Sequence, residues 1–546
     1  MEAHWATVWE SIADAIGDEV ALVQGGRRRS WAELDDRAAR LASAFANAGA
    51  GPNARVAQYL YNSLEYVESY YATLKGRGVP INVNYRYVGE ELLHIVSDSG
   101  AEVLLYHASL ADRVADIRER LGGVKLLIEV EDSDRPPATV AGSVRYRDVV
   151  ARHSPAARIV RGGDDRAMTY TGGTTGMPKG VVGRVGPGVR ALLSAVPPML
   201  GEPGVTDPAA AAEVATTLRD AGRRLVVLPA CPLMHGTGMV IGLHTSLVVG
   251  GTIVLLESRR FDPDEAWAVV ERERVGLLAI VGDAFGRPLL RALRDGPHRD
   301  LSSLRYISSS GAMWSAEVRA ALLERLPQLT LLDYISSTEG LMGVAISSAG
   351  RVASTGRFTP VPGVKVFTDD GTEVAAGSGD AGIVGLSGGV PDGYHNDPAK
   401  SARTFRVVGG VRYSFPGDWA TVEADGSLLL LGRGSQCINT GGEKVFPEEV
   451  EEALKLHQAI DDCLVFGVPD ERFGQRIVAV AAPAPGQGTD AAGALAEAGR
   501  HLASYKLPRQ VVFVETVPRA PNGKADYRAA KALFEGALTG RTQSGS

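Results

Sequence analysis

A threonine- and glycine-rich segment between Met168 and Val182, MTYTGGTTGMPKGVV, carries the clearest chemical signal in the sequence. Its glycines let the backbone approach a ligand closely, and its amides and hydroxyls can donate hydrogen bonds to phosphate oxygens. A lysine adds positive charge to the same stretch. The segment therefore predicts a phosphate-binding loop. The residues that we expect to contact phosphate are Thr171, Gly172, Gly173, Thr174, Thr175, Gly176 and Lys179.

Two other interpretations of this segment are weaker. The Walker phosphate loop needs lysine directly after glycine and then serine or threonine, whereas Met177 and Pro178 stand before Lys179 here. A merely flexible loop would not require hydroxyls, glycines and a lysine to coincide in one short stretch. The residues thus favour phosphate binding without a Walker motif.

Five further blocks follow along the chain. They are SSGAMW near Ser309, DYISSTEG from Asp333, PGDWA from Pro416, LGRGSQCINTGGEKVFPEEVE from Leu431 and PRAPNGKADY from Pro518. With the glycine-rich segment, these blocks resemble the signature motifs of the adenylate-forming superfamily of acyl-CoA synthetases, firefly-type luciferases and non-ribosomal adenylation domains. The resemblance covers nearly the whole chain and is closest to actinobacterial acyl-CoA synthetases of the fatty-acid and steroid-side-chain type. It implies ATP-dependent activation of a carboxylic acid as an acyl-adenylate, followed by transfer to coenzyme A.

The resemblance assigns magnesium and phosphate contacts to DYISSTEG. Glu339 matches the family's Mg²⁺ ligand, and one or two carboxylates plus phosphates is how this ion is usually bound. Thr338 would donate its hydroxyl to phosphate. Ile335 replaces the aromatic residue that stacks on adenine in relatives, so stacking should be weaker or apolar, and Tyr334 cannot be assumed to replace it. The nucleotide site also includes Ser310, Gly311, Ala312 and Asp333.

Two residues near the end of the large domain match ribose-binding positions. Asp418 in PGDWA corresponds to the carboxylate that accepts hydrogen bonds from both ribose hydroxyls, although an aspartate there is also a typical turn residue. Arg433 in LGRG matches an arginine that reaches the ribose or phosphate. The hinge between the domains follows, and Ser435 stands where relatives carry Asp or Lys. We therefore expect domain rotation, and the departure at Ser435 leaves its pivot open.

Lys524 lies in PNGKADY, close to the C-terminus. A lone lysine after Asn-Gly is usually a surface turn residue. The matching lysine of the family, however, enters the active site during adenylation and stabilises charge on the carboxylate and the α-phosphate. Rotation of the small domain would withdraw Lys524 and present Gly441, Gly442 and Glu443 to the pantetheine thiol. One site would then catalyse two half-reactions in turn.

The acyl pocket is expected around LPACPLMHGTGM. His235 matches a histidine beside this pocket in relatives, and pocket lining is favoured over a direct catalytic role. Gly238 and its small or flexible neighbours favour an open apolar cavity. Ser336 occupies the slot where acetate-type enzymes have tryptophan, and no aspartate between Pro229 and Met239 could pair with a substrate amine. A medium- or long-chain fatty acid or a bulky steroid-side-chain acid is therefore favoured.

Three other functions stay open. A fatty acyl-AMP ligase that loads a carrier protein would share every ATP-site residue, although no carrier domain is recognisable in the sequence. A non-catalytic nucleotide sensor would be expected to lose Lys524, Glu339 or the glycine-rich segment, and all three are present. Luciferase-like oxidation depends on a special substrate. Coenzyme A is thus the favoured acceptor.

The elements that must position these residues alternate between short apolar runs and amphipathic stretches. Runs such as Arg55–Leu60 and Leu225–Leu228 alternate with stretches such as Trp31–Ala48 and Pro263–Arg274, which is typical of βα units around largely parallel sheets. A turn at Asp425-Gly426 and a helix from Pro447 are also expected. We predict an α/β fold: a large ATP- and acyl-binding domain over residues 1–433 and a small mobile α/β domain over residues 434–546, which carries Lys524.

Composition is that of an ordinary globular protein. The 57 basic and 64 acidic residues give a net charge of −7, which offers no basic field for nucleic acid. The N-terminus lacks a signal-peptide pattern and no long apolar run appears, so we expect no integral membrane contact. The three cysteines show no metal-type spacing, which favours the cytoplasm. The sequence leaves a homodimer open.

Overall fold

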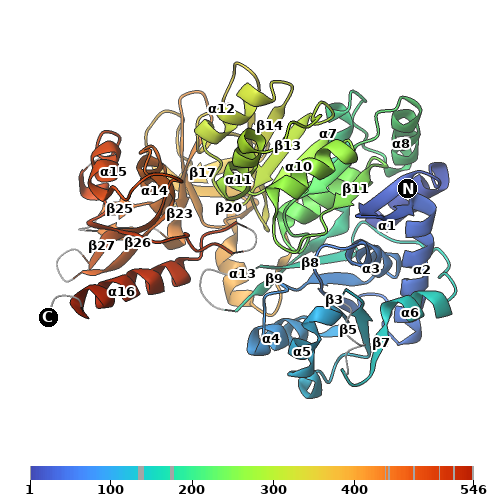
Figure 1. Ribbon diagram of the computed structural model, residues 1–546. Coiled ribbons are helices and arrows are strands. Elements are labelled where there is room, and N and C mark those ends of the chain that lie inside the picture. The colour runs from blue at the N-terminus through green and yellow to red at the C-terminus, as the bar shows by residue number, and fades with distance from the viewer. Residues whose placement is uncertain are drawn as a thin grey trace.

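The structure, a computed structural model, describes residues 2–132, 140–171, 177–436, 438–440, 443–470, 474–502, 504–520 and 523–543. In Figure 1 the chain runs from blue at the right, through green and yellow, to red at the left. The last helices and strands gather at one end of the molecule, beside the rest of the chain. The C-terminal elements therefore form a group of their own.

The N-terminal part contains a parallel five-stranded sheet. Its strand order is β4 (Val79–Asn82), β3 (Arg55–Tyr59), β5 (Ala101–His107), β6 (Leu126–Val130), β7 (Ser143–Arg145). The neighbouring helices are α2 (Trp31–Asn47), α3 (Leu64–Lys75), α4 (Gly89–Ser99), α5 (Ala111–Ala115) and α6 (Tyr146–Arg152). Strands β3 and β5 are buried along almost their whole length, as strands of a parallel sheet usually are. The βα units expected here are confirmed.

A second, larger sheet begins with parallel strands. After the antiparallel edge strand β2 (Arg27–Ser30), the order is β1 (Val20–Gln24), β11 (Thr252–Leu255), β10 (Val226–Pro229), β12 (Leu277–Ile280), β13 (Tyr306–Ser310), β14 (Thr330–Ser337). The helices of this region are α1 (Trp5–Ala15), α7 (Val185–Met199), α8 (Ala211–Asp220), α9 (Thr245–Leu247), α10 (Pro263–Arg272), α11 (Gly282–Asp295), α12 (Ala316–Arg325) and the π-helix η4 (Thr237–His244). The carboxyl ends of β13 and β14 lie side by side, where ligand sites of such sheets form.

Beyond β14 the same sheet is antiparallel, and here the expectation of largely parallel sheets was wrong. Its strands are β15 (Gly340–Ser347), β16 (Arg357–Pro360), β17 (Val364–Phe367), β18 (Ala381–Ser387), β20 (Phe405–Val408), β21 (Val411–Ser414), β22 (Asp418–Val422) and β23 (Leu428–Arg433). Short connections join β14 to β15, β20 to β21 and β22 to β23, whereas a parallel pair needs a crossover of a dozen or more residues. The hairpin expected at Asp425-Gly426 is confirmed, and Gly426 takes the positive φ of 80° that its turn requires.

A three-stranded sheet holds the two ends of the threonine- and glycine-rich segment. Strands β8 (Arg166–Thr171) and β9 (Lys179–Arg184) are antiparallel, with Thr171 in register with Lys179. Strand β19 (Gly393–Tyr394) pairs with β9 and is followed by helix α13 (Pro398–Thr404). Gly172, Gly173, Thr174, Thr175 and Gly176 lie outside the described residues. The predicted phosphate loop is therefore placed by its two flanking strands.

The C-terminal part forms a separate five-stranded sheet with its own apolar clusters. Its strands are β25 (Glu443–Val445), β24 (Ile438–Thr440), β27 (Gly474–Pro483), β26 (Ile460–Asp470) and β28 (Gln510–Phe513). Its helices are α14 (Pro447–Lys455), α15 (Ala491–Ala498) and α16 (Tyr527–Gln543). Helix α14 begins at Pro447, as predicted. The proposed domain boundary at 433/434 falls between β23 and the 3₁₀ turn η5 (Gly434–Gln436) and stays a prediction.

The remaining short elements are the 3₁₀ turns η1 (Ala108–Leu110), η2 (Arg118–Arg120), η3 (Pro208–Ala210) and η6 (Ser504–Lys506). None of the described helices is both long and apolar enough to cross a membrane.

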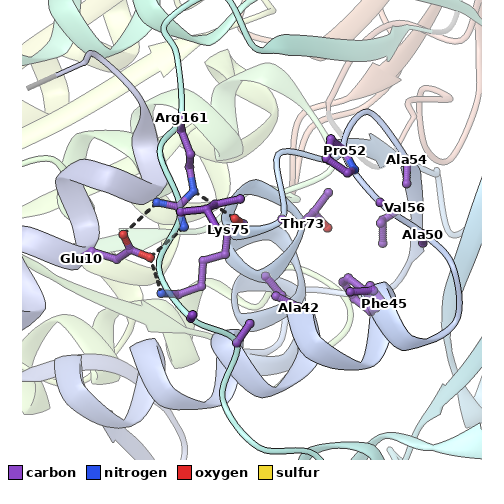
Figure 2. Close-up of a pocket in the computed structure, with 18 residues that line it drawn as sticks. Glu10, Ala42, Phe45, Ala50, Pro52, Ala54, Val56, Thr73, Lys75 and Arg161 are labelled. Atoms are coloured by element: carbon purple, nitrogen blue, oxygen red, sulfur yellow. Dashed lines mark hydrogen bonds and ion pairs between the residues drawn. The ribbon is translucent and has the colours of Figure 1, made fainter.

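Buried charges join α1 to the N-terminal sheet region. Figure 2 shows the Glu10 carboxylate facing the Lys75 ammonium and the Arg161 guanidinium at the edge of a cavity of about 200 Å³. The carboxylate accepts from Lys75 at 2.7 Å and from Arg161 at 2.8 and 3.0 Å. Lys75 also pairs with Asp35 at 2.7 Å. These charges are compensated within the protein, so the cluster is structural.

Candidate functional site

An apolar cavity of about 540 Å³ lies beside the carboxyl ends of β13 and β14. Helix α7 provides one wall through Leu192, Val196 and Met199, and η4 provides another through Met239 and Ile241. Its volume is within the range of roughly 300–1,000 Å³ that is common for small-molecule sites. The cavity can therefore hold a sizeable apolar ligand.

Hydroxyl groups gather at the end of this cavity beside β13 and β14. Ser310, Ser336, Thr237 and Thr338 all line it. The Oγ atom of Ser310 lies 2.6 Å from that of Ser336 and donates to the Tyr334 carbonyl at 2.9 Å. Thr237 donates to the Ser310 carbonyl at 3.1 Å, which fixes the start of η4 against β13. We call this group of four the hydroxyl end of the cavity.

Lys524 lies at the site although it belongs to the C-terminal part. A Cβ atom placed on Gly311 would lie 3.6 Å from Cε of Lys524 and 3.5 Å from Oγ1 of Thr237. Gly311 has a φ of 95°, which favours glycine. The turn before Lys524 packs on the start of α11, since a Cβ atom on Gly523 would lie 3.0 Å from Cβ of Ala284. The sequence-predicted lysine and SSGAMW block are thus brought together.

His235 lines the cavity in its neutral form. Burial is the main cause that lowers its pKa to about 3, and the nearby Lys524 charge lowers it further. Its Nε2 atom has no hydrogen-bond partner among the described residues. An uncharged imidazole in this place is compatible with the predicted lining role.

Two short contacts connect the segment around β19 with predicted site residues. Tyr394 donates a hydrogen bond to Oε1 of Glu339, and Lys179 forms an ion pair with Asp397. The hydrogen bond from Lys179 is the main cause that lowers the pKa of the Asp397 carboxyl. One short segment therefore holds both the lysine of the phosphate loop and the predicted magnesium ligand, and neither Tyr394 nor Asp397 was singled out from the sequence.

Strand β14 divides its residues between two faces. Tyr334 and Ser336 line the cavity, whereas Ile335 is buried in an apolar cluster with Phe358. Asp333 is also buried, and desolvation raises its pKa to about 7, against the opposing charge of Arg319. The alternation of side chains along a strand could have predicted that Tyr334 lines the cavity, because residues two apart, such as Tyr334 and Ser336, share a face. The nucleotide-binding roles expected of Asp333 and Ile335 stay predictions.

Three other predicted residues, Gly238, Ala312 and Asp418, do not line the cavity. Gly238 is not a lining residue; a side chain on it would meet the Pro232 carbonyl at 2.3 Å, so its part is to let η4 approach the preceding loop. Ala312 packs against the main core. Asp418 is buried at the start of β22 and pairs in register with Arg433.

The predicted domain-alternation residues are placed only in part. Ser435 lies in η5, where the structure describes the backbone. Glu443 begins β25. Gly441 and Gly442 lie outside the described residues. Their roles stay predictions.

A second groove, of about 650 Å³, adjoins the Lys524 turn. Phe285 lines it and would touch a Cβ atom on Gly523 at 3.4 Å. The guanidinium of Arg259 lies 4.7 Å from the ring centre of Tyr61. Its basic lining residues are Arg86, Arg113, Arg259 and Arg260. Guanidinium groups beside aromatic rings suit a ligand that carries both phosphates and an aromatic base. We call this the arginine groove.

No group of three or more histidine, cysteine, aspartate or glutamate side chains that could hold a metal occurs among the described residues. Glu339 is half-buried beside the hydroxyl end. One carboxylate fits a magnesium ion that takes its other ligands from phosphates and water. The residues present are therefore compatible with Mg²⁺ bound together with a nucleotide.

Comparisons with known proteins agree with this geometry. The family model described as AMP-binding enzyme matches residues 9–394, and the model described as AMP-binding enzyme C-terminal domain matches residues 449–524. The chain belongs to the AMP-binding enzyme family. Its two family segments cover the region of the cavity and the turn that carries Lys524.

The similarity to other members of the family covers nearly the full length of this chain. A 3-oxocholest-4-en-26-oate–CoA ligase of Rhodococcus rhodochrous is 39% identical over 97% of this chain and 96% of that protein. A medium/long-chain-fatty-acid–CoA/3-oxocholest-4-en-26-oate–CoA ligase of Mycobacterium marinum is also 39% identical, with the same coverage. The solved structure of ATP-bound MatB from Rhodopseudomonas palustris has a TM-score of 0.77 at 26% identity, over 96% of this chain and 98% of MatB. A benzoate CoA ligase from Burkholderia xenovorans has a TM-score of 0.79 at 22% identity, over 96% and 99%, and supports the fold.

Proposed function

We propose that this AMP-binding enzyme is an acid–CoA ligase that activates a carboxylic acid as an acyl-adenylate and then forms its coenzyme A thioester. The observation that carries the proposal is the position of Lys524 beside Gly311, at the hydroxyl end of an apolar cavity. A cation and several hydroxyls at one end of such a cavity suit an acid whose carboxylate meets a nucleotide phosphate there.

The first half-reaction joins two anions, so positive charge must come from the protein and from magnesium. We assign Lys524 to the carboxylate and the α-phosphate, where it would stabilise charge that builds up as the carboxylate oxygen attacks phosphorus and pyrophosphate leaves. Thr338 and the phosphate loop ending at Lys179 would hold phosphate oxygens. Asp418 and Arg433 are assigned to the ribose, as their family matches imply. Bound magnesium would supply charge neutralisation, and Glu339 would hold it.

The acid is proposed to be a medium- or long-chain fatty acid or a bulky steroid-side-chain acid. The relatives from Rhodococcus and Mycobacterium carry such acids in their names. The apolar cavity of about 540 Å³ supports this class, because acetate would leave most of it empty. Ser336, which lines the cavity at the slot of the acetate-type tryptophan, leaves that end open.

Coenzyme A is proposed as the acceptor. The arginine groove offers guanidinium groups for its phosphates and aromatic rings for its adenine, and it adjoins the turn of Lys524. The thiol would attack the acyl carbonyl and release AMP, after the small domain has rotated about Ser435 and brought Gly441, Gly442 and Glu443 forward. A cytoplasmic location and a homodimer are further parts of the proposal.

A coupled assay across acids tests the function. Pyrophosphate release and thioester formation would be measured with acetate, octanoate, palmitate, benzoate and a steroid-side-chain acid, with ATP, Mg²⁺ and excess coenzyme A. We expect octanoate, palmitate or the steroid acid to give kcat/KM at least about tenfold above acetate, since burial of extra methylenes contributes roughly 0.8 kcal/mol each. Pyrophosphate release with thioester formed only on a carrier protein would replace coenzyme A as acceptor. No pyrophosphate release with any acid would contradict acyl-adenylate formation.

A further inference from the structure

Asn82, the last residue of β4, joins two segments of the site that lie far apart in the chain. Its Nδ2 atom donates to the Tyr170 carbonyl at 2.9 Å and to the Met234 carbonyl at 2.7 Å. Its Oδ1 atom accepts a hydrogen bond from the Tyr170 amide at 2.8 Å. Both amide hydrogens and one lone pair of the carbonyl oxygen are therefore used, and a single side chain bonds two backbone segments to each other.

The two segments belong to different sides of the site. Tyr170 lies near the end of β8 and directly precedes Thr171, where the predicted phosphate loop begins. Met234 directly precedes His235 in the loop after β10, and both residues line the apolar cavity. Asn82 lines the cavity as well. Its amide group therefore bridges the nucleotide side and the acid side of the site.

Each segment also has an anchor of its own. The Asn62 side chain holds the loop after β10, because it donates to the Cys231 carbonyl at 3.1 Å and accepts from the Leu233 amide at 2.8 Å. Strand β8 is held by its pairing with β9 and by the Tyr170 hydroxyl, which donates to Asp98 of α4 at 2.6 Å. Without the bridging amide, each segment would keep these contacts and lose only its bond to the other segment.

The separation of the two segments matters because the first half-reaction joins the ligands that they hold. The carboxylate oxygen must lie about 3–3.5 Å from the α-phosphorus before it attacks, and a displacement of about 1 Å can slow such a step on the order of 10²-fold. The attacking oxygen must also lie in line with the departing pyrophosphate. A short side chain with three hydrogen bonds at the end of a strand can fix this geometry from outside the reacting groups.

We propose that Asn82 is a positioning residue that holds the acid-binding loop and the phosphate-binding strand at the separation that the attack on the α-phosphorus requires. The inference rests on the proposed function and adds to it a residue that acts through the backbone of Tyr170 and Met234. Asn82 gives up no proton and forms no bond to either substrate in this role. Its loss should therefore slow the attack itself and leave the binding of each substrate largely intact.

Asn82→Ala removes all three hydrogen bonds. With octanoate or palmitate, ATP and Mg²⁺, kcat for pyrophosphate release should fall about 10²-fold, because the two reacting groups are no longer aligned. KM for the acid and KM for ATP should each stay within about threefold, since each segment keeps its own anchor. A raised KM for one substrate at an unchanged kcat would place Asn82 in the binding site of that substrate and overturn the inference. Parent values of kcat and KM would also overturn it.

Thioester formation from supplied acyl-adenylate separates positioning from a general loss of structure. In acyl-adenylate a covalent bond already joins the acid to the α-phosphate, so their alignment no longer depends on the protein. With coenzyme A in excess, this half-reaction of Asn82→Ala should stay within about threefold of the parent rate. A variant that had only lost folded protein would lose both half-reactions equally, and that result would overturn the inference.

Asn82→Asp is a second variant of the same position, and it decides the question if Asn82→Ala does not fold. It keeps the shape of the side chain and the acceptor for the Tyr170 amide, but it loses both donors and turns a negative charge toward two carbonyls. Its kcat for pyrophosphate release should fall at least as far as that of Asn82→Ala, again without an equal loss in thioester formation. A parent kcat in Asn82→Asp would contradict the proposal.

Asn84→Ala is the matched control. Asn84 lies two residues further along the same segment, accepts from the Arg86 amide at 3.0 Å and does not line the cavity, so both half-reactions should keep their parent rates. A fall in pyrophosphate release as large as that of Asn82→Ala would assign the effect to the whole segment and count against the proposal. If the parent protein releases no pyrophosphate with any acid, the proposed function fails; if it does and Asn82→Ala matches it, only this inference fails.

Discussion

Lys524 lies beside Gly311, with its Cε atom 3.6 Å from the position of a Cβ atom on that glycine. Gly311 directly follows β13 of the large sheet, whereas Lys524 belongs to the C-terminal part, and the contact depends on the packing of the Gly523 turn against α11. Within the C-terminal part, Arg519 anchors this turn to β26, since it pairs with Asp462 at 2.6 Å. The arrangement presents the lysine to the cavity, as adenylation would require.

Lys524→Ala is the direct test of this arrangement. We expect pyrophosphate release to slow by about 10²–10³-fold, because the charge on the carboxylate and phosphate loses its stabilising cation. Thioester formation from supplied acyl-adenylate should change by less than about threefold, since Lys524 would be withdrawn in that step. Lys531→Ala, at an exposed position of α16, controls for the loss of a lysine in the small domain. Equal loss in both half-reactions would contradict the two-conformation scheme.

Glu339→Gln tests the magnesium assignment. The amide keeps the shape and can still meet Tyr394, but it loses the negative charge that attracts Mg²⁺. The Mg²⁺ concentration for half-maximal pyrophosphate release should rise about tenfold. Glu373→Gln, an exposed carboxylate paired with Lys365, should leave it unchanged. An unaltered magnesium dependence in Glu339→Gln would remove its assigned role.

The sequence predicted the βα half of the fold because apolar runs and amphipathic stretches of the right length repeat there. It did not predict the antiparallel half. Short buried strands have the same composition in parallel and antiparallel sheets, and only the connections between strands determine which pairing forms. Likewise, the helix from Pro447 has a local start signal, whereas nothing local indicates that Lys524 meets Gly311.

The sequence indicates candidate site residues where they belong to a motif, but it does not indicate contacts that arise from packing between distant segments. His235 and Ser336 line the cavity, and their part in binding the acid stays a prediction. Gly238 was expected in the pocket but serves close backbone packing, a role that the residue type allows equally well. The contact of Tyr394 with Glu339 joins segments far apart in the chain, and no spacing rule could have paired them.

A double variant tests the arginine groove. Arg86 and Arg260 are exposed, line the groove and form no ion pair among the described residues, so their charges are available to a ligand. Replacing both with alanine should raise KM for coenzyme A about tenfold or more, as each charge-assisted hydrogen bond contributes roughly 1.5–3 kcal/mol. Pyrophosphate release without coenzyme A should be unchanged. Arg351→Ala, outside the groove, is the control; an unaltered KM in the double variant would place the nucleotide of coenzyme A elsewhere.

Buried histidines predict loss of stability in acid. Burial is the main cause that lowers the pKa of His107 to about 4, and of His235 and His244 to about 3, from an ordinary value of 6.5. Below pH 6.5 the unfolded chain binds protons that the folded protein does not, so their contribution is complete above about pH 6.5 and is lost as pH falls toward 4 and 3. Each histidine should add about 1.4 kcal/mol per pH unit to this loss.

His107→Gln isolates one of these contributions. Glutamine can still accept the hydrogen bond from the Tyr61 amide, which lies 3.1 Å from Nδ1 of His107, but it cannot protonate. The free energy of unfolding, measured with denaturant at about pH 7, 6 and 5, should therefore fall less steeply with acid than in the parent protein, by about 1.4 kcal/mol per pH unit. His501→Gln, at an exposed position on the small domain, should keep the parent slope. Equal slopes for the parent and His107→Gln would show that this imidazole already takes up a proton in the folded state.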